Sequence, residues 1–480
     1  KLIDVSFGGP LSRKVRLFMA VHYETAWPFL PTPFPLRGRQ IVGNMTFDIK
    51  EGLGAQIFYT NNVEYGFNFE GYNSSSYTSF RSWVWDRIIG VSETRNISNL
   101  IGLKFTKFFG KQSYLETKIG YLNTRFNRGA DIISPDRYTE ELANSGMWRH
   151  FNMPDLFEIG HPDNDFIDER SETFSLELSF TSQINRWNLI TAGLQYNRYN
   201  VDVRNRLSLA SPVHAYDEIY AGKPYELGIF LQDKMEFEGM IANVGMRFDA
   251  YNYNVMYYVD RYSPIRNPYY DPKEPPVGKN RYYNSELALK ARSKTFYKLQ
   301  PRVGISFPVS VNTVFYLNYI STMQRPPFSG SIRQRFTKGG YPNFLGNPNL
   351  NPEETNSYEV GIVQGLGEGF TFELGGYYKD VKNLIETAYF FDQQQTLYQT
   401  FVNRDYAYIK GVKISLNKRR GYLSGYIRYN YSVAKGKSST PFDAPVIYRE
   451  KPGENELPIE LPDPRDIYLS FDRTHNATAQ

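Results

Sequence analysis

The sequence predicts an all-β protein, specifically a large antiparallel transmembrane β-barrel. The first observation is that apolar and polar residues alternate along almost all of the 480 residues. In one such run Tyr297, Leu299 and Val303 fall on one face, whereas Lys298 and Arg302 fall on the other. Side chains of a strand point to opposite faces in turn, so one face is apolar and the other polar. The second observation is the number and length of these runs, because a tilted strand needs about ten residues to cross a bilayer.

The composition supports this fold class and excludes others. Aromatic residues make up 16% of the chain, with 39 Tyr and 34 Phe, as expected for the aromatic girdles of outer-membrane barrels. No uninterrupted apolar stretch reaches the roughly 18 residues of a membrane-spanning helix, so a helical membrane protein is excluded. The chain has no cysteine, which excludes disulfides and thiolate sites. A net charge of +5 is small for this length and gives no indication of nucleic-acid binding.

The alternation defines about seventeen strands, and the connections between them alternate between short turns and long loops. The expected strands are residues 1–8, 15–23, 41–51, 54–69, 97–109, 113–125, 171–183, 187–203, 223–238, 240–253, 297–308, 312–321, 353–366, 369–380, 398–418, 421–435 and 465–476. Outer-membrane barrels have short periplasmic turns and long extracellular loops. We therefore expect the short turns, such as 110–112, 238–240 and 367–369, at one end of the barrel. The loops around residues 145, 275 and 335 belong at the other end.

The alternation also predicts which side chains face the lumen. Charged residues are costly in hydrocarbon and solvated in a water-filled lumen, so they should point inward. The expected inward residues are Arg302, Arg247, Glu226, Glu373 and Arg428, and the expected outward residues are Leu299, Val303, Leu227, Phe372 and Ile427.

One segment carries a more specific signal. The run LGNPNLNPEETNSYEVGI at residues 345–362 resembles the signature of TonB-dependent outer-membrane receptors, in which an Asn-Pro-x-Leu-x-Pro-Glu segment leads from an outer loop into a strand. The matching residues are Asn347, Pro348, Asn349, Leu350, Pro352 and Glu353. The two prolines cannot donate ladder hydrogen bonds, so the strand should begin at about Glu353. Residues 228–252, 301–328 and 401–421 resemble the same receptors, especially long ones of Bacteroidota-like bacteria.

The resemblance implies a plug domain inside a barrel of about 22 strands in the bacterial outer membrane. Residues 1–480 are then expected to form the barrel domain alone, without the plug and the last strands. Because the first strand leads into a short turn, about one strand should precede Lys1 and about four should follow Gln480. The strand at 1–8 should therefore not pair with the strand at 465–476.

The resemblance also implies a function. Such a receptor is a transporter and not an enzyme, and it imports a small ligand, peptide or glycan with energy that the TonB complex supplies through the plug. Expected partners are outer-membrane lipids, lipopolysaccharide and a surface lipoprotein, and no cofactor is expected. Two other functions remain open: a surface-assembly scaffold that anchors partner proteins, and a passive diffusion pore.

The long loop at residues 322–344 is the candidate ligand-binding element. It carries Arg325, Arg333 and Arg335 together with the aromatic residues Phe336 and Tyr341. Guanidinium groups and aromatic rings can bind anionic or aromatic ligands by bidentate hydrogen bonds and stacking. The alternative is that the loop packs on its neighbours or on lipopolysaccharide phosphates.

No metal site is predicted. The five His are scattered, and none forms a pair at metal-ligand spacing. Asp163, Asp165, Asp168 and Glu169 lie close together, as in an oxygen-rich calcium site, but the segment lacks the glycine and glutamate spacing of an EF-hand. A solvated acidic loop is therefore the preferred interpretation, and calcium the alternative.

Overall fold

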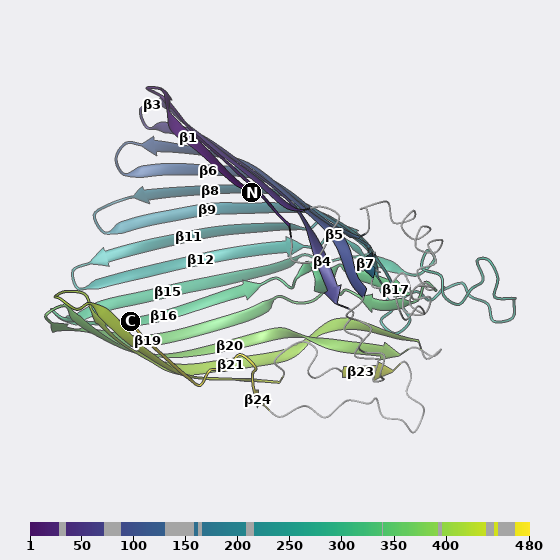
Figure 1. The fold of residues 1–480 in the computed structure, drawn as a ribbon. Helices are drawn as coiled ribbons and strands as arrows, with labels where there is room; N and C mark the ends of the chain where they lie inside the picture. The colour runs from purple at the N-terminus through teal and green to yellow at the C-terminus, as the bar shows by residue number, and fades with distance from the viewer. Residues whose placement is uncertain are drawn as a thin grey trace.

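The wall of the protein is one long antiparallel sheet that curls around an open interior, as seen in a computed structural model (Figure 1). The structure describes residues 1–27, 35–71, 88–129, 158–161, 166–207, 216–337, 339–391, 396–437, 446–449 and 466–480. Neighbouring wall strands follow one another along the chain, and each pair is antiparallel. The all-β barrel predicted from the alternation is confirmed.

Each predicted strand has a counterpart in the wall. The wall strands are β1 (Leu2–Ser12), β2 (Val15–Ala26), β3 (Leu36–Lys50), β4 (Leu53–Gly71), β5 (Ile88–Phe109), β6 (Ser113–Gly129), β8 (Phe166–Gln183), β9 (Asn188–Leu207), β11 (Tyr225–Phe237), β12 (Met240–Asn252), β15 (Phe296–Ser310), β16 (Thr313–Gln324), β19 (Glu353–Gly367), β20 (Phe370–Phe391), β21 (Leu397–Lys418), β22 (Gly425–Gly436), β24 (Ile467–Tyr468) and β25 (His475–Ala479). Several extend further toward the loops than predicted, because main-chain pairing continues beyond the regular alternation. The pairing of β4 with β5, for example, reaches Gly71 and Ile89.

The long connections carry shorter elements. These are β7 (Glu158–His161), β10 (Tyr216–Gly222), β13 (Met256–Tyr258), β14 (Lys290–Arg292), the helix α3 (Phe328–Ser331), β17 (Gln334–Thr337), β18 (Pro342–Leu345) and β23 (Val446–Arg449). Among the described residues, no helix is long and apolar enough to cross a membrane.

The short turns lie together at one end of the barrel, as predicted (Figure 1, left). Backbone hydrogen bonds link several of these turns to the next hairpin: the amide of Phe108 donates to the carbonyl of Gly52 at 2.8 Å, and the amide of Gly365 donates to the carbonyl of Asn312 at 2.7 Å. β17 and the teal loop between β13 and β14 lie at the opposite end. The loop around residue 145 lies outside the described residues.

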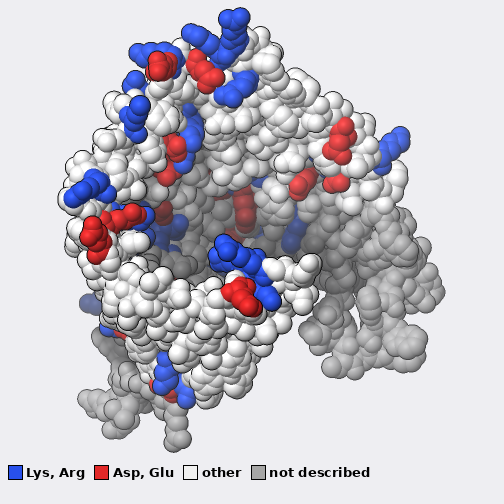
Figure 2. Space-filling view, turned by 90° about the vertical axis from the view of Figure 1, so that its left-hand side faces the viewer, with Lys and Arg blue, Asp and Glu red and all other residues white. Residues whose placement is uncertain are grey.

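The faces of the strands also follow the prediction. Leu299 and Ile427 are 51% and 60% exposed although apolar, as expected for side chains that face lipid. Glu226, Arg247 and Arg302 line an internal cavity. Figure 2, which views the barrel from the short-turn end, shows charged side chains within the hollow of the barrel and a largely uncharged outer flank.

The same alternation holds on the far side of the wall. Glu373 lies opposite Ser415, which lies opposite Arg428, so these residues share one face. Leu374, the neighbour of Glu373, is 40% exposed on the other face. Val303, Leu227 and Phe372 each adjoin an inward residue and therefore point outward, as predicted.

The two edges of the sheet remain apart. β1 pairs with β2 and β25 pairs with β22, whereas no pairing joins β1 to β24 or β25, all of which the structure describes. The expectation for these edges is confirmed. The predicted strand at 465–476 is wrong in its extent, because the chain turns between β24 and β25. There the Asp472 carboxylate accepts the amide of Ala434 at 2.6 Å and the hydroxyl of Thr474 at 2.6 Å, which replaces regular ladder pairing.

A three-stranded bridge of β10, β17 and β18 connects two distant parts of the wall. β10 pairs with β9, β17 pairs with β10 and β18, and β18 contacts β21 in a parallel pair at Phe344 and Gln399. Along the wall, β9 and β21 are separated by β11, β12, β15, β16, β19 and β20. The bridge joins β9 to β21 through three short strands, whereas six strands of the wall lie between them. The bridge therefore crosses the interior of the barrel at the loop end. It delimits the interior space that lies beneath it.

Candidate functional site

A cavity of about 510 Å³ lies on the inner face of β9, β11, β12, β15 and β16. Its lining is largely polar and includes Gln195, Asn197, Gln300, Arg302 and Thr322. These residues come from strands whose inward positions are polar by alternation, so the sheet itself brings them together.

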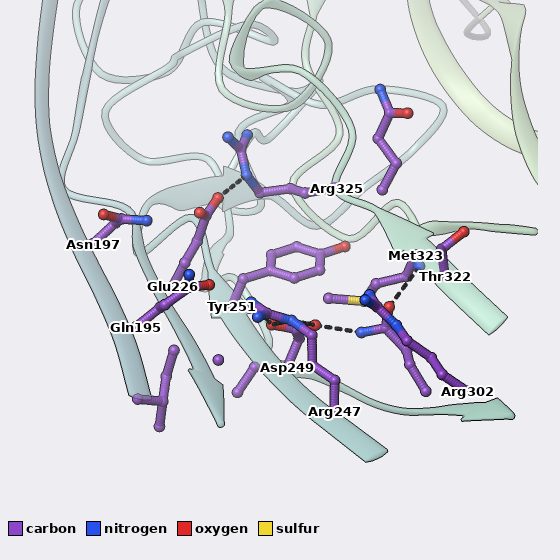
Figure 3. Close-up of a pocket in the computed structure, with 15 residues that line it drawn as sticks. Gln195, Asn197, Glu226, Arg247, Asp249, Tyr251, Arg302, Thr322, Met323 and Arg325 are labelled. Atoms are coloured by element: carbon purple, nitrogen blue, oxygen red, sulfur yellow. Dashed lines mark hydrogen bonds and ion pairs between the residues drawn. The ribbon is translucent and has the colours of Figure 1, made fainter. Parts of the chain in front are cut away.

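The floor of the cavity is a fixed ion pair. Arg247 and Asp249 stand two residues apart on β12 and thus share a face, with Nη2 and Oδ1 2.7 Å apart. Gln300 donates its amide to Asp249 and accepts the amide of Met323 at 3.0 Å (Figure 3). A Cβ atom at Gly228 would come within 2.2 Å of Arg247 Nη2, so glycine at this position leaves space for the guanidinium.

The opposite side of the cavity is held by Arg325, at the end of β16. Its Nε donates to the carboxylate of Glu226, its Nη1 donates to Pro326 O at 3.0 Å, and its guanidinium lies 4.1 Å from the ring centre of Phe328. The Tyr199 hydroxyl donates to Glu226 at 3.1 Å. Ion pairing and the cation–π contact therefore fix the orientation of Arg325.

Two groups in the cavity are available to a ligand. Tyr251 is 1% exposed, and its hydroxyl has no hydrogen-bond partner within the described part of the chain. In Figure 3 the ring of Tyr251 lies between Arg325 and the Arg247–Asp249 pair. The guanidinium of Arg302 lines the same cavity without a carboxylate partner among the described side chains. A buried hydroxyl without a partner is costly, so a ligand that bonds to the Tyr251 hydroxyl gains affinity. Arg302 is exposed and offers a cation that a ligand can reach.

The other predicted loop residues belong to the bridge. Arg333 and Arg335 both donate to one carboxylate oxygen of Glu218 on β10, at 2.7 and 2.9 Å, and the Glu218 side chain is only 6% exposed. Phe336 packs against the cluster that contains Phe390. The two arginines therefore join β17 to β10.

Tyr341 is 45% exposed, and its ring packs edge-on against Tyr283 with centroids 5.4 Å apart. The structure thus brings Arg325 to the cavity and places Arg333, Arg335, Phe336 and Tyr341 elsewhere in the loop layer. A ligand role for this set remains a prediction, and packing within the loop layer accounts for the contacts seen.

The signature segment lies directly before β19, which begins at Glu353 as predicted, and side-chain hydrogen bonds fix its position. The side chain of Asn347 donates to Phe401 O at 3.0 Å and accepts the amide of Asn349 at 3.0 Å. Leu350 is 1% exposed and packs in a cluster with Phe401. Pro348 is fully buried, and Pro352 O accepts the side chain of Asn383 at 3.1 Å. The segment therefore has a structural role in seating the loop on β21.

The acidic segment is used in part for ion pairs. Asp168 accepts hydrogen bonds from Arg125 at 3.0 Å, Arg170 at 2.9 Å and Asn127 at 2.7 Å. Burial raises the pKa of Asp168, but the hydrogen bonds from Arg170 and Arg125 outweigh it and the net shift is downward. Glu169 accepts the side chain of Asn205 at 2.8 Å.

Asp163 and Asp165 of the same segment lie outside the described residues. In the part of the chain that the structure describes, no three His, Cys, Asp or Glu residues are placed to hold a metal ion.

The sequence interpretation missed most of the cavity. Gln195, Asn197, Tyr251 and Gln300 were part of predicted strands but were not selected as site residues. Their signal is available in the sequence: large amides and a tyrosine occupy inward positions near the loop ends of adjacent strands. The pairing that makes these strands neighbours is regular, so their inward ends could have been grouped.

Comparisons with known proteins identify the family. The family model described as TonB dependent receptor-like, beta-barrel, matches residues 43–468. The FrpB iron transporter from Neisseria meningitidis is similar in fold, with a TM-score of 0.56 at 11% identity over 90% of this chain and 59% of that one. For the outer membrane transporter YddB from Escherichia coli the TM-score is 0.58 at 10% identity, over 91% and 55%.

The siderophore receptor PirA from Pseudomonas aeruginosa gives a TM-score of 0.54 at 12% identity, over 91% of this chain and 63% of that one. The chain thus spans 55% to 63% of the length of these three solved transporters. The family model covers most of the chain, and its members are transporters of the bacterial outer membrane and not enzymes. The chain therefore belongs to the TonB-dependent receptor family, as a β-barrel of the bacterial outer membrane.

Proposed function

We propose that this protein is an outer-membrane receptor that binds an extracellular ligand and imports it with energy from the TonB complex. The observation that carries the proposal is the polar cavity beneath the bridge, in a barrel of this family. A lumen lined by fixed ion pairs is hydrated and rigid, and it is bounded by a loop layer at the extracellular end. These are the properties that a ligand-capturing barrel needs.

We further propose that residues 1–480 act as the barrel domain and that a plug elsewhere in the protein contacts TonB. The solved transporters are longer than this chain, which supports a further domain. A barrel of this width without a plug would leave an aqueous hole in the membrane. A surface lipoprotein that covers the loop layer fits the same arrangement.

The cavity supports a polar ligand with an anionic group. Arg302 offers a cation without a carboxylate partner in the described structure, and Tyr251 offers a buried hydroxyl. FrpB and PirA are named as an iron transporter and a siderophore receptor. For this chain we propose a ligand of the wider class that a hydrogen-bonding cavity accepts: an anionic chelate, peptide or glycan.

The test is growth on single nutrient sources. Cells that lack the gene receive the wild-type gene or an empty vector, and are grown on ferric chelates, peptides or oligosaccharides with TonB present or depleted. We expect one source to support growth only when both the protein and TonB are present. Growth that needs the protein but not TonB would establish a passive pore, and no dependence on the protein for any source would favour a surface scaffold.

The same strains test the cavity. We expect Arg302→Gln to lower uptake of the identified source about tenfold, because a charge-assisted contact is lost. The matched control is Arg428→Gln, which removes an inward cation from β22, outside the cavity lining. Equal losses in both variants would show that general luminal charge, and not this cavity, matters.

A further inference from the structure

The wall contains a seam between β15 and β16, near the loop end of the barrel. Main-chain pairing of these two strands runs from the short turn to Arg302 and Ile320 and stops there. Nearer the loops, residues 296–301 of β15 stay paired with β12, and residues 321–324 of β16 stay paired with β19. Pro301 comes directly before Arg302 on β15, and it has no amide hydrogen to donate to a ladder. Beyond this rung the main chains of β15 and β16 are therefore no longer joined to each other.

Polar side chains close the seam in place of the main chain. The amide of Met323 donates to the side chain of Gln300 at 3.0 Å (Figure 3). Lys298 of β15 forms an ion pair with Glu354 of β19, across the end of β16. These two side chains are 26% and 25% exposed, so water reaches the pair. A partly exposed ion pair contributes little stability, and the seam can therefore open at a lower cost than a continuous ladder.

The internal cavity adjoins this seam. Gln300 and Arg302 line the cavity from β15, and Thr322 and Met323 line it from β16, so the cavity reaches both edges of the seam. Arg302 stands on the last paired rung, opposite Ile320, and the two side chains share the inward face. Ile320 is apolar but 39% exposed. A cation without a carboxylate partner among the described side chains and an exposed apolar side chain thus lie together at the inner end of the seam.

The outer end of the seam lies at the border of the membrane. Tyr319 follows the inward face by one residue and points outward, where its ring lies 5.1 Å from that of Tyr358. The ring of Tyr358 lies in turn 6.5 Å from that of Tyr378. A row of outward tyrosines marks the border between hydrocarbon and headgroups. Because Tyr319 adjoins the last paired rung, the seam begins at this border, and on its other side the outward Leu299 is 51% exposed.

We propose that the seam is a lateral opening for the alkyl chain of an amphipathic ligand whose anionic head group sits in the cavity. Arg302 binds the head group, and Ile320 lies along the first carbons of the chain. The rest of the chain passes between β15 and β16 toward the membrane, and the contacts of Gln300 and Lys298 across the seam open for it. The inference rests on the import function proposed above and narrows its ligand to an anionic molecule with one alkyl chain.

Two other kinds of ligand fit the seam less well. A wholly polar ligand gains nothing from an opening at this level, because headgroups and hydrocarbon lie outside it. An uncharged amphiphile leaves Arg302 without a partner. The length of the alkyl chain and the charge of the head group therefore distinguish the three.

The experiment measures binding of octanoate, decanoate and decanol to the full-length protein in amphipol by calorimetry, without TonB. We expect decanoate to bind about 15-fold more tightly than octanoate, at about fourfold for each added methylene. Decanol should bind about tenfold more weakly than decanoate, because it lacks the charge-assisted contact with Arg302. Equal affinities of octanoate and decanoate, or of decanol and decanoate, would overturn the proposal.

A covalent link across the seam tests where the chain lies. Residues 1–480 contain no cysteine, so a short bifunctional maleimide can join the two thiols of Lys298→Cys/Glu354→Cys. With the link in place, decanoate should bind no more tightly than octanoate. The matched control links Gly304→Cys to Asn318→Cys, which lie opposite each other in the intact ladder, and should keep the preference for decanoate. A preference that survives the link across the seam, or that is lost with the control link, would overturn the assignment to the seam.

Folding is checked by the heat-dependent mobility of each variant on a gel. Should the cysteine variant fail to fold, Ile320→Asn places a polar side chain at the inner end of the seam and should lower the preference for decanoate severalfold. Val314→Asn is its control, since Val314 lies on the same face of β16 nearer the short turn and is 37% exposed. Equal preferences in the two variants would contradict the proposal. No uptake is measured here, so a negative result leaves the import function standing, and a failed growth test leaves this binding measurable.

Discussion

The internal cavity and a cleft of about 230 Å³ on the outer wall lie on opposite faces of the same strand, β9. On β9, Gln195 and Asn197 line the cavity, whereas Arg198 and Asn200 line the cleft. Inside, Arg247 and Arg325 are each held by a carboxylate. On the outer wall, Asp168 holds both Arg125 and Arg170. Each face thus combines cations fixed by carboxylates with a cation that has no carboxylate partner among the described side chains, Arg302 inside and Arg198 outside.

The ion pairs of the lumen and of the bridge should stabilise the structure around them. The largest effect is expected at Glu218, whose side chain is 6% exposed and joins Arg333 to Arg335. Glu218→Gln leaves two guanidinium groups without a carboxylate, which should cost about 3 kcal/mol of local stability. Hydrogen exchange of β10 and β17 measures it, and protection equal to wild type would contradict a role of this carboxylate in the bridge.

A smaller effect is expected at Glu226. Its carboxylate and Arg325 are 27% and 22% exposed, so solvent screens the pair in part. Glu226→Gln should lower the free energy of opening near Arg325 by about 2 kcal/mol, again by hydrogen exchange.

The control for this pair is Asp48→Asn, which removes the partner of Arg16. Those side chains are 56% and 62% exposed, so no measurable change is expected there. A double variant that adds Arg325→Met to Glu226→Gln should recover part of the loss, because no unpaired charge remains. Additive losses would show that the two groups act independently.

The wall could be predicted from the sequence, and the bridge could not. Alternation requires only that each strand pair with its neighbour in the chain, so inward Arg302 and outward Leu299 follow from position alone. The bridge depends on pairing of β17 with β10, more than a hundred residues away in sequence, through short strands without strong alternation. Nothing local in the chain specifies that Glu218 meets Arg333 and Arg335. The charges of the loop were therefore visible in the sequence, but their partners were not.

The outer wall responds to acid through Asp168, near the loop end of β8 and beyond the apolar band. Its folded pKa is below its usual value, so its stabilising contribution is present above the unfolded pKa of about 4 and is lost as pH falls through the folded pKa. The protection factors of amides at the loop ends of β6 and β8, which are exchange rates corrected for the intrinsic pH dependence, should be constant from about pH 7 to 5 and should fall below about pH 4. In Asp168→Asn the profile should be flat, and an unchanged acid response would assign it to another carboxylate.

The smallest effect on stability is expected for Tyr251→Phe, which separates the role of this hydroxyl in stability from its role in ligand binding. The hydroxyl of Tyr251 is buried without a partner in the described structure, so Tyr251→Phe removes an uncompensated polar atom. Without ligand, the variant should be as stable as wild type or more stable, by up to about 1 kcal/mol, in thermal or denaturant unfolding. Uptake of the growth-supporting source should nevertheless fall severalfold, because the ligand loses a hydrogen bond. A clear loss of stability with normal uptake would show that the hydroxyl serves the fold, and would leave Arg302 as the ligand contact in this cavity.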